Sequence, residues 1–116
     1  MNTFPNLNRT MVLIEGRQPF YDWVNSVFPS DTPLKPEDTV EYNSYLLESE
    51  LYFEEPKEAL KRYWKDIFEN ELFDMSTDPN DWPKISWSLF NSYFQCHFSS
   101  IVHDLGKDPL KQEIYI

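Results

Sequence analysis

Apolar and polar positions along the chain repeat with two different periods, and these periods predict where strands and helices lie. Residues 10–15 (TMVLIE) form a short apolar run rich in β-branched side chains, which is typical of a strand. Residues 19–27 predict a helix, because proline suits its first position and one face is apolar, formed by Phe20, Trp23, Val24 and Val27. This helix is expected to end before Pro29, since the residue preceding a proline disfavours helical backbone.

The middle of the chain predicts a loop, a strand and a long helix. Residues 29–38 contain three prolines and predict a loop. Residues 40–49 (VEYNSYLLES) are rich in Tyr, Val and Leu and predict a strand, which residues 51–53 could extend. A helix that begins at Pro56 is indicated by an apolar stripe at helical spacing, formed by Ala59, Leu60, Tyr63, Trp64, Ile67, Phe68 and Leu72.

The last third of the chain predicts a loop, a short helix and a strand. Residues 74–84 are rich in Asp, Asn, Ser and Pro and predict turns. Residues 86–94 place apolar side chains on one side of a helix, and residues 97–105 (HFSSIVHDL) predict a strand that ends at Gly106. The expected order is β-α-β-α-α-β, an α+β fold with a small three-stranded sheet and about three helices packed on it.

Length and composition indicate one domain with its own core. The chain has 116 residues, 41% of them hydrophobic, with nine Phe, seven Tyr and four Trp. Each of these rings buries about 150–250 Å² in a core, so a net charge of −10 belongs here to a folded chain. We expect residues 1–116 to form a single acidic domain, with residues 1–9 and 106–116 loosely held.

Several classes of protein are disfavoured by what the sequence contains. Cys96 is the only cysteine, which excludes an intramolecular disulfide and a thiolate metal cluster. With only two glycines, the chain has no Gly-rich phosphate loop. The first residues show no secretory signal, and no run approaches the length of a membrane span. The sequence therefore predicts a cytoplasmic protein that does not contact membranes.

Four segments together resemble a group of small uncharacterised bacterial proteins. They are VLIEGRQPFYDWVNSV, EEPKEALKRYWKDIFENELF, DPNDWPK and the stretch from Phe94 to Leu105, and the resemblance covers most of residues 11–105. It implies a small bacterial cytoplasmic α+β domain. That group has no assigned activity, so the resemblance implies no catalytic residue. The shared positions are of the kind that form turns and cores, namely Pro19, Phe20, Trp23, Trp82 and Pro83.

The two histidines and the cysteine are the first candidates for chemistry. On one strand His97 and His103 would lie about 20 Å apart, too far to bind one zinc ion together. Either histidine could pair with a carboxylate as an acid–base residue, but no nucleophile motif accompanies them, so a structural hydrogen bond is the favoured interpretation. Cys96 and His97 would point to opposite faces of a strand, so a buried structural thiol is expected.

The loop after the long helix carries alternate oxygen side chains, as calcium-binding loops do. However, Pro79 stands where a calcium loop needs glycine, and Ile85 stands where it needs a bidentate glutamate. A series of Asx turns that caps the next helix explains the same residues. We therefore expect no metal site and no cofactor.

The distribution of charge is the most informative functional feature of the sequence. Between Glu37 and Asp81 there are 14 acidic and four basic residues, a net charge of −10, whereas the remaining six acidic and six basic residues cancel. Such a field repels nucleic acids and anionic membranes and attracts basic proteins. The alternative is that the charge only keeps an aromatic-rich domain in solution.

The sequence thus predicts a non-catalytic accessory protein that presents an acidic surface, with exposed aromatic rings such as Tyr45, to a basic partner. The candidate surface consists of Glu37, Asp38, Glu41, Tyr42, Glu48, Glu50, Tyr52, Glu54, Glu55, Asp74, Asp78, Asp81 and Trp82. The rival hypothesis is a small ligand-binding protein or minor enzyme, whose pocket would be formed by His97, His103, Trp64, Trp82 and Trp87.

Two further possibilities stay open at this point. One is an acidic inhibitor that imitates nucleic acid with rows of carboxylates. The other is a homodimer formed through an edge strand, either the strand that begins at Thr10 or the one that contains residues 99–103.

Overall fold

Three antiparallel strands form the sheet, and the first strand in the sequence lies in the middle. The computed structural model describes residues 5–48 and 56–113. The strands are β1 (Arg9–Gly16), β2 (Asn43–Glu48) and β3 (Phe94–Ser99), in the order β2-β1-β3. Val12 is aligned with Tyr45 of β2 and with Phe98 of β3. This is the predicted α+β fold, with the predicted order of elements.

Buried and partly buried side chains alternate along β1, and this alternation shows which face of the sheet the helices cover. Val12 and Ile14 are buried, while Met11 and Leu13 between them are only partly buried. Because successive side chains point to opposite faces, the Val12 face contributes to the core and the other face does not. Leu47 adds the buried position of β2 to the same face.

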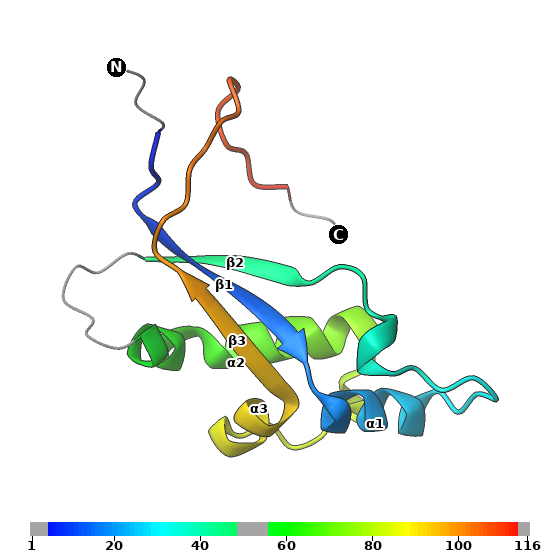
Figure 1. Cartoon of the computed structure of the whole chain (residues 1–116). Helices are drawn as coiled ribbons and strands as arrows, with labels where there is room; N and C mark the ends of the chain where they lie inside the picture. Colours follow the sequence, from blue (N-terminus) through cyan, green and yellow to red (C-terminus); the bar gives the residue numbers. More distant parts are fainter. Residues whose placement is uncertain (1–4, 49–55, 114–116) are drawn as a thin grey trace.

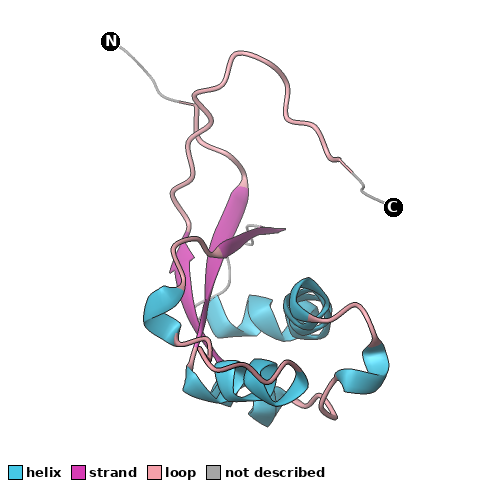
Figure 2. Ribbon diagram, turned by 90° about the vertical axis from the view of Figure 1, so that its right-hand side faces the viewer, coloured by secondary structure: helices cyan, strands magenta, loops and turns pink. Residues whose placement is uncertain are grey.

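Three α-helices complete the described fold: α1 (Gln18–Val27), α2 (Pro56–Met75) and α3 (Trp87–Tyr93). The long helix α2 lies along the sheet, whereas α1 and α3 lie at the end where β1 finishes and β3 begins (Figures 1 and 2). Two short 3-10 turns, Pro36–Asp38 and Pro79–Asp81, interrupt the loops before β2 and after α2. Within the described residues, no helix is both long and apolar enough to span a bilayer.

Aromatic rings fill the space between the sheet and the helices. Phe68 of α2 is fully buried, and its ring centroid lies 5.7 Å from that of Phe90, 5.6 Å from that of Tyr93 and 5.5 Å from that of Phe94. Phe20 of α1 joins this cluster through Phe94, with 4.9 Å between the ring centroids. The cluster connects all three helices to β3, and edge-on ring pairs of this kind add to the energy of burial.

The last strand differs from its prediction. β3 begins at Phe94, directly after α3, and ends at Ser99, so the predicted strand 97–105 was wrong at both ends. His103 lies outside β3 and pairs with Asn6 in an isolated bridge. The two histidines therefore do not share a strand, and the distance argument that assumed one does not apply.

The structure also changes the predictions for the N-terminal tail and for the edge strands of the sheet. Residues 5–7 pair with residues 102–104, and the Leu7 amide donates to the Val102 carbonyl at 2.7 Å, so part of the first predicted tail is held by hydrogen bonds. β1 is central, so the prediction of an edge at Thr10 was wrong, whereas β3 is an edge strand. β2 begins three residues later than predicted, and its suggested extension over 51–53 lies outside the described residues.

Candidate functional site: an acidic cavity beside the long helix

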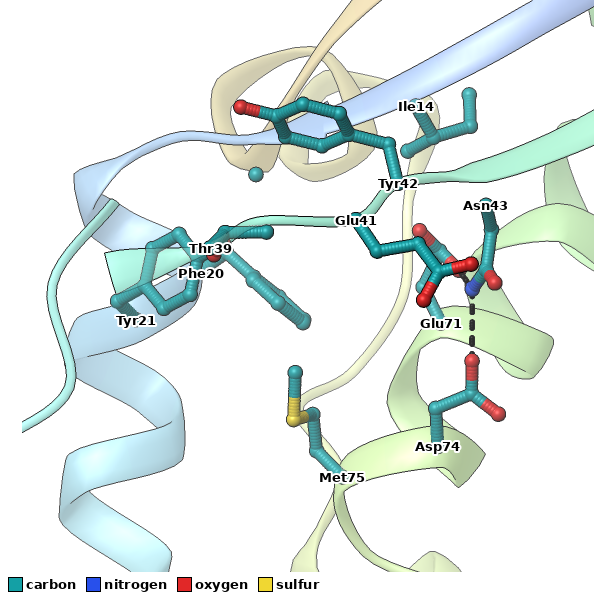
Figure 3. Close-up of a pocket in the computed structure, with 11 residues that line it drawn as sticks. Ile14, Phe20, Tyr21, Thr39, Glu41, Tyr42, Asn43, Glu71, Asp74 and Met75 are labelled. Carbon is teal, nitrogen blue, oxygen red and sulfur yellow. Dashed lines mark hydrogen bonds between the residues drawn. The ribbon is translucent and has the colours of Figure 1, made fainter. Parts of the chain in front are cut away.

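A cavity of about 220 Å³ lies where α1, the loop before β2 and the C-terminal end of α2 meet (Figure 3). Three carboxylates line it: Glu41 from the loop, and Glu71 and Asp74 from α2. Apolar and aromatic side chains line the remaining wall, among them Ile14, Phe20, Tyr21, Tyr42 and Met75. Negative charge and apolar surface therefore meet in one concave site.

Glu71 is the central carboxylate, and the fold holds it out of water. Its exposed fraction is 8%, which is unusual for a carboxylate. Its Oε2 atom accepts a hydrogen bond from the Asn43 side-chain amide and another, 2.9 Å long, from the Tyr45 hydroxyl. Burial raises the pKa of Glu71, and the nearby Asp74 charge adds to the rise, while these two hydrogen bonds oppose it.

Asn43 joins the two carboxylates of α2 to the sheet. It is the first residue of β2, and its Nδ2 atom donates both to Glu71 and, at 2.7 Å, to Oδ2 of Asp74 (Figure 3). Glu71 and Asp74 are three residues apart in a helix, so they lie on the same side of it. One amide group therefore holds two carboxylates side by side.

Tyr45 forms a second layer of support behind Glu71. Its hydroxyl donates to Glu71 and accepts a 2.8 Å hydrogen bond from the Asn70 side chain. Burial is the main cause of a raised pKa for the Tyr45 hydroxyl, and the charges of Glu71 and Asp74 act in the same direction. The hydroxyl is thus a neutral hydrogen-bond donor that fixes Glu71.

The wall opposite α2 is set by a close approach of α1 to β1. A Cβ atom at Gly16 would lie 2.9 Å from the rings of Phe20 and Tyr21, so this position needs glycine. The Tyr21 hydroxyl is hydrogen-bonded to the hydroxyl of Thr39, which attaches the loop before β2 to α1. These contacts hold the loop that carries Glu41 and Tyr42 at the mouth of the cavity.

The two acids of α2 lie at the end of the helix where its dipole is negative. The last turn of α2 contains no basic residue, although cations are the charges that stabilise a helix C-terminus. Glu71 and Asp74 therefore add like charge to an already negative end. A cation that entered the cavity would relieve this repulsion.

Such an environment suits an organic cation with an apolar stem, as in a lysine or arginine side chain. Carboxylates would pair with the charged end, and aromatic rings and Met75 would contact the stem. Among the described residues, no group of three or more His, Cys, Asp or Glu side chains is arranged to bind a metal ion.

The structure brings three residues of the predicted acidic surface together at this cavity: Glu41, Tyr42 and Asp74. Glu37 and Asp38 are exposed in the 3-10 turn before the loop, and the Asp38 carboxylate accepts a 3.0 Å hydrogen bond from the Lys35 amide. Glu50, Tyr52, Glu54 and Glu55 lie outside the described residues.

The other predicted surface residues lie apart from the cavity. Glu48 is at the far end of β2, where it pairs with Arg62 at 3.6 Å. Asp78 caps the turn after α2 by accepting from the Asn80 amide, and Asp81 accepts a hydrogen bond from Ser76. Trp82 lines a shallow hollow together with four residues of α2, namely Asp66, Glu69, Asn70 and Phe73.

Sequence reasoning missed Glu71, Asn43 and Tyr21 as site residues. One signal was present for Glu71, because it lies four residues after Ile67 and three after Phe68, which places a carboxylate on the apolar stripe of α2. Asn43 gave no comparable signal, since its role depends on how β2 is placed against α2.

The residues of the rival pocket are not brought together. His97 accompanies Glu15 on the uncovered face of the sheet, with 2.8 Å between His97 Nε2 and Glu15 Oε2. His103 Nδ1 lies 3.1 Å from the Pro5 carbonyl oxygen. Trp64 and Trp87 pack edge to face between α2 and α3, 6.0 Å apart, beneath Lys61 and Lys65.

Cys96 faces the core side of β3, opposite to His97, as the alternation of the strand predicts. Burial raises the pKa of the Cys96 thiol to about 11, although the charges of Lys57 and Arg17 oppose the rise. At neutral pH the thiol is therefore protonated and a poor nucleophile.

Comparisons with known proteins give no match: none of the protein-family models, curated proteins or solved structures searched is similar to this chain. The resemblance to small uncharacterised bacterial proteins thus stays a prediction.

Proposed function

We propose that the chain is a non-catalytic accessory protein that binds a basic protein through the acidic cavity and the acidic surface of α2. The observation that carries this proposal is the pair Glu71 and Asp74, held together by Asn43 at the negative end of a helix. A lysine or arginine side chain of the partner would enter the cavity and neutralise both carboxylates.

The surroundings of the cavity support a protein partner rather than a free small cation. Val40 and Tyr42 lie beside the mouth, with exposed fractions of 96% and 37%, and Phe73 on α2 is 51% exposed. Exposed aromatic and aliphatic side chains around a charged centre are typical of interaction surfaces. A separate hollow next to Trp82 presents two further acidic residues of α2, Asp66 and Glu69.

The proposal is tested with the double variant Glu71→Gln, Asp74→Asn, which removes two negative charges from the cavity. A matched control, Asp31→Asn with Asp108→Asn, removes two charges from exposed loops. In nuclear magnetic resonance titrations, benzamidinium serves as the cationic probe and benzamide as its neutral counterpart. The wild type and the control should show saturable shifts at the side-chain amide of Asn43 with benzamidinium, weakening as salt is added.

A second arm uses the partner itself. Immobilised wild type and control variant should retain the same basic protein at low salt and release it at moderate salt, whereas the cavity variant should lose it. If benzamide shifts Asn43 as strongly as benzamidinium, or if the cavity variant retains the same partner as the wild type, the proposal fails.

A further inference from the structure

A second cavity, of about 310 Å³, lies between β3 and the first turns of α2, and none of its lining residues is shared with the acidic cavity. Its polar lining consists of Arg17, Lys57, Asn91, Gln95 and Cys96. Arg17 is held there by its backbone, because its amide donates a 2.7 Å hydrogen bond to the Tyr93 carbonyl just before β3. Asn91 is held by a 2.8 Å hydrogen bond from its side chain to the Trp87 carbonyl.

The charge of this cavity is opposite to that of the molecule. The chain carries 20 acidic and ten basic residues, yet both charged side chains that line the cavity are basic, and none is acidic. Arg17 and Lys57 come from segments 40 residues apart, and both line the cavity together with Cys96. Burial is the main cause of the raised pKa of the Cys96 thiol, and the charge of Glu71 also raises it, whereas the charges of Lys57 and Arg17 lower it. Two cations therefore converge on one concave site of an acidic protein.

The rest of the lining is apolar and comes from Leu60, Phe94 and Phe98. Guanidinium and ammonium groups recognise carboxylates and phosphates, and the side-chain amide of Asn91 offers a further polar contact. Apolar walls favour a ligand that also has an apolar body, and the volume is at the small end of the range for ligand cavities. An inorganic anion alone would leave this wall uncovered.

We propose that this cavity binds a small organic anion, with its carboxylate or phosphate between Arg17 and Lys57 and its apolar body against Leu60, Phe94 and Phe98. This site is separate from the acidic cavity and does not depend on the function proposed for it. The two cavities have opposite charge, so they select ligands of opposite charge.

Cys96 provides a direct readout, because it lines the cavity and is the only cysteine of the chain. The experiment measures the rate at which iodoacetamide, a neutral reagent, alkylates the thiol at about pH 9, at constant ionic strength. The probes are benzoate and phenyl phosphate, with benzyl alcohol as the neutral counterpart, benzamidinium as the cationic one and inorganic phosphate as the anion without an apolar body.

Benzoate, phenyl phosphate or both should slow alkylation severalfold in a saturable manner, and the stronger of the two identifies the acid group of the ligand. The double variant Arg17→Gln, Lys57→Gln should lose this protection, whereas Lys107→Gln with Lys111→Gln, which removes two exposed cations elsewhere, should keep it. The replaced side chains are exposed, so both variants should retain the circular dichroism of the wild type.

The proposal is overturned if neither organic anion protects Cys96, or if benzyl alcohol or benzamidinium protects it equally, since no recognition of negative charge would then operate. Equal protection by inorganic phosphate would contradict the role of the apolar wall. These comparisons use the wild-type protein, so they decide the matter even if the variant does not fold.

Discussion

Glu71 is a charged residue at a position where the helix pattern predicts an apolar one. Phe68, one helical turn earlier, and Leu72, the next residue, are both fully buried. Glu71 lies between them but carries a carboxylate, which Asn43 and Tyr45 hold by hydrogen bonds. Buried acids of this kind lower stability unless hydrogen bonds compensate them. The hydrogen bonds from Asn43 and Tyr45 supply this compensation, and they also fix the carboxylate at the wall of the acidic cavity.

The raised pKa of Glu71 makes a prediction about stability and pH. Because the folded state holds the proton more tightly than the unfolded state, the contribution of Glu71 to the free energy of unfolding decreases as pH rises above the ordinary carboxyl value of 4.5. Glu71→Gln should lack this decrease, so its stability relative to the wild type should grow between acidic and neutral pH. Urea unfolding at several pH values measures the difference.

The control for this prediction is Glu69→Gln, which changes an exposed carboxylate on the same helix. If both variants show the same pH-dependent difference from the wild type, burial of Glu71 is not its cause.

At the scale of the element, the pattern of the sequence located the long helix best and the last strand worst. The stripe of α2 is regular over many turns, and proline marks its beginning, so local signals suffice. β3 begins immediately after α3 because Phe94 continues from helix to strand without a loop, and no turn residue separates them. The apolar residues Ile101 and Val102 favoured a strand in the prediction, but in the structure β3 ends before them, at Ser99.

Helix α3 is short, so its N-terminal cap should matter. Ser86 accepts a 3.1 Å hydrogen bond from the Leu89 amide through its hydroxyl. Removing it with Ser86→Ala should lower the free energy of unfolding by about 1 kcal/mol. Ser88→Ala, within the same helix and exposed, is the control and should change stability little or raise it slightly, since alanine favours helix. Chemical denaturation of both variants tests this; equal losses would argue against a capping role.

At the scale of the whole molecule, one aromatic cluster holds helices and sheet together. Phe68→Ala should lower the free energy of unfolding by about 3–5 kcal/mol, because the ring is fully buried and contacts Phe90, Tyr93 and Phe94. Phe73→Ala on the same helix removes a ring that is 51% exposed, and its loss should be much smaller. Thermal unfolding measures both, and similar shifts would show that the cluster is not the main core.

Local patterns in the sequence were enough to predict the fold class, but they did not predict either of the two cavities. The excess of acidic residues between Glu37 and Asp81 predicted which part of the chain is negative. It did not predict that Asn43 would join Glu71 to Asp74, or that Arg17 and Lys57 would converge beside Cys96. Both arrangements depend on contacts between segments far apart in sequence, which no local pattern encodes.

The pairing of residues 5–7 with residues 102–104 has a mechanical consequence. These segments lead into β1 and out of β3, two antiparallel neighbours, so both connections leave the sheet at the same end (Figure 1). Tension applied through these two segments would load the hydrogen bonds between β1 and β3 one after another, starting at this end of the sheet. It would not load them all at once, as shear along the strands does. Under such tension the hydrogen bond between Asp104 and Pro5 would part first, then the one between Leu7 and Val102, and only afterwards those between β1 and β3.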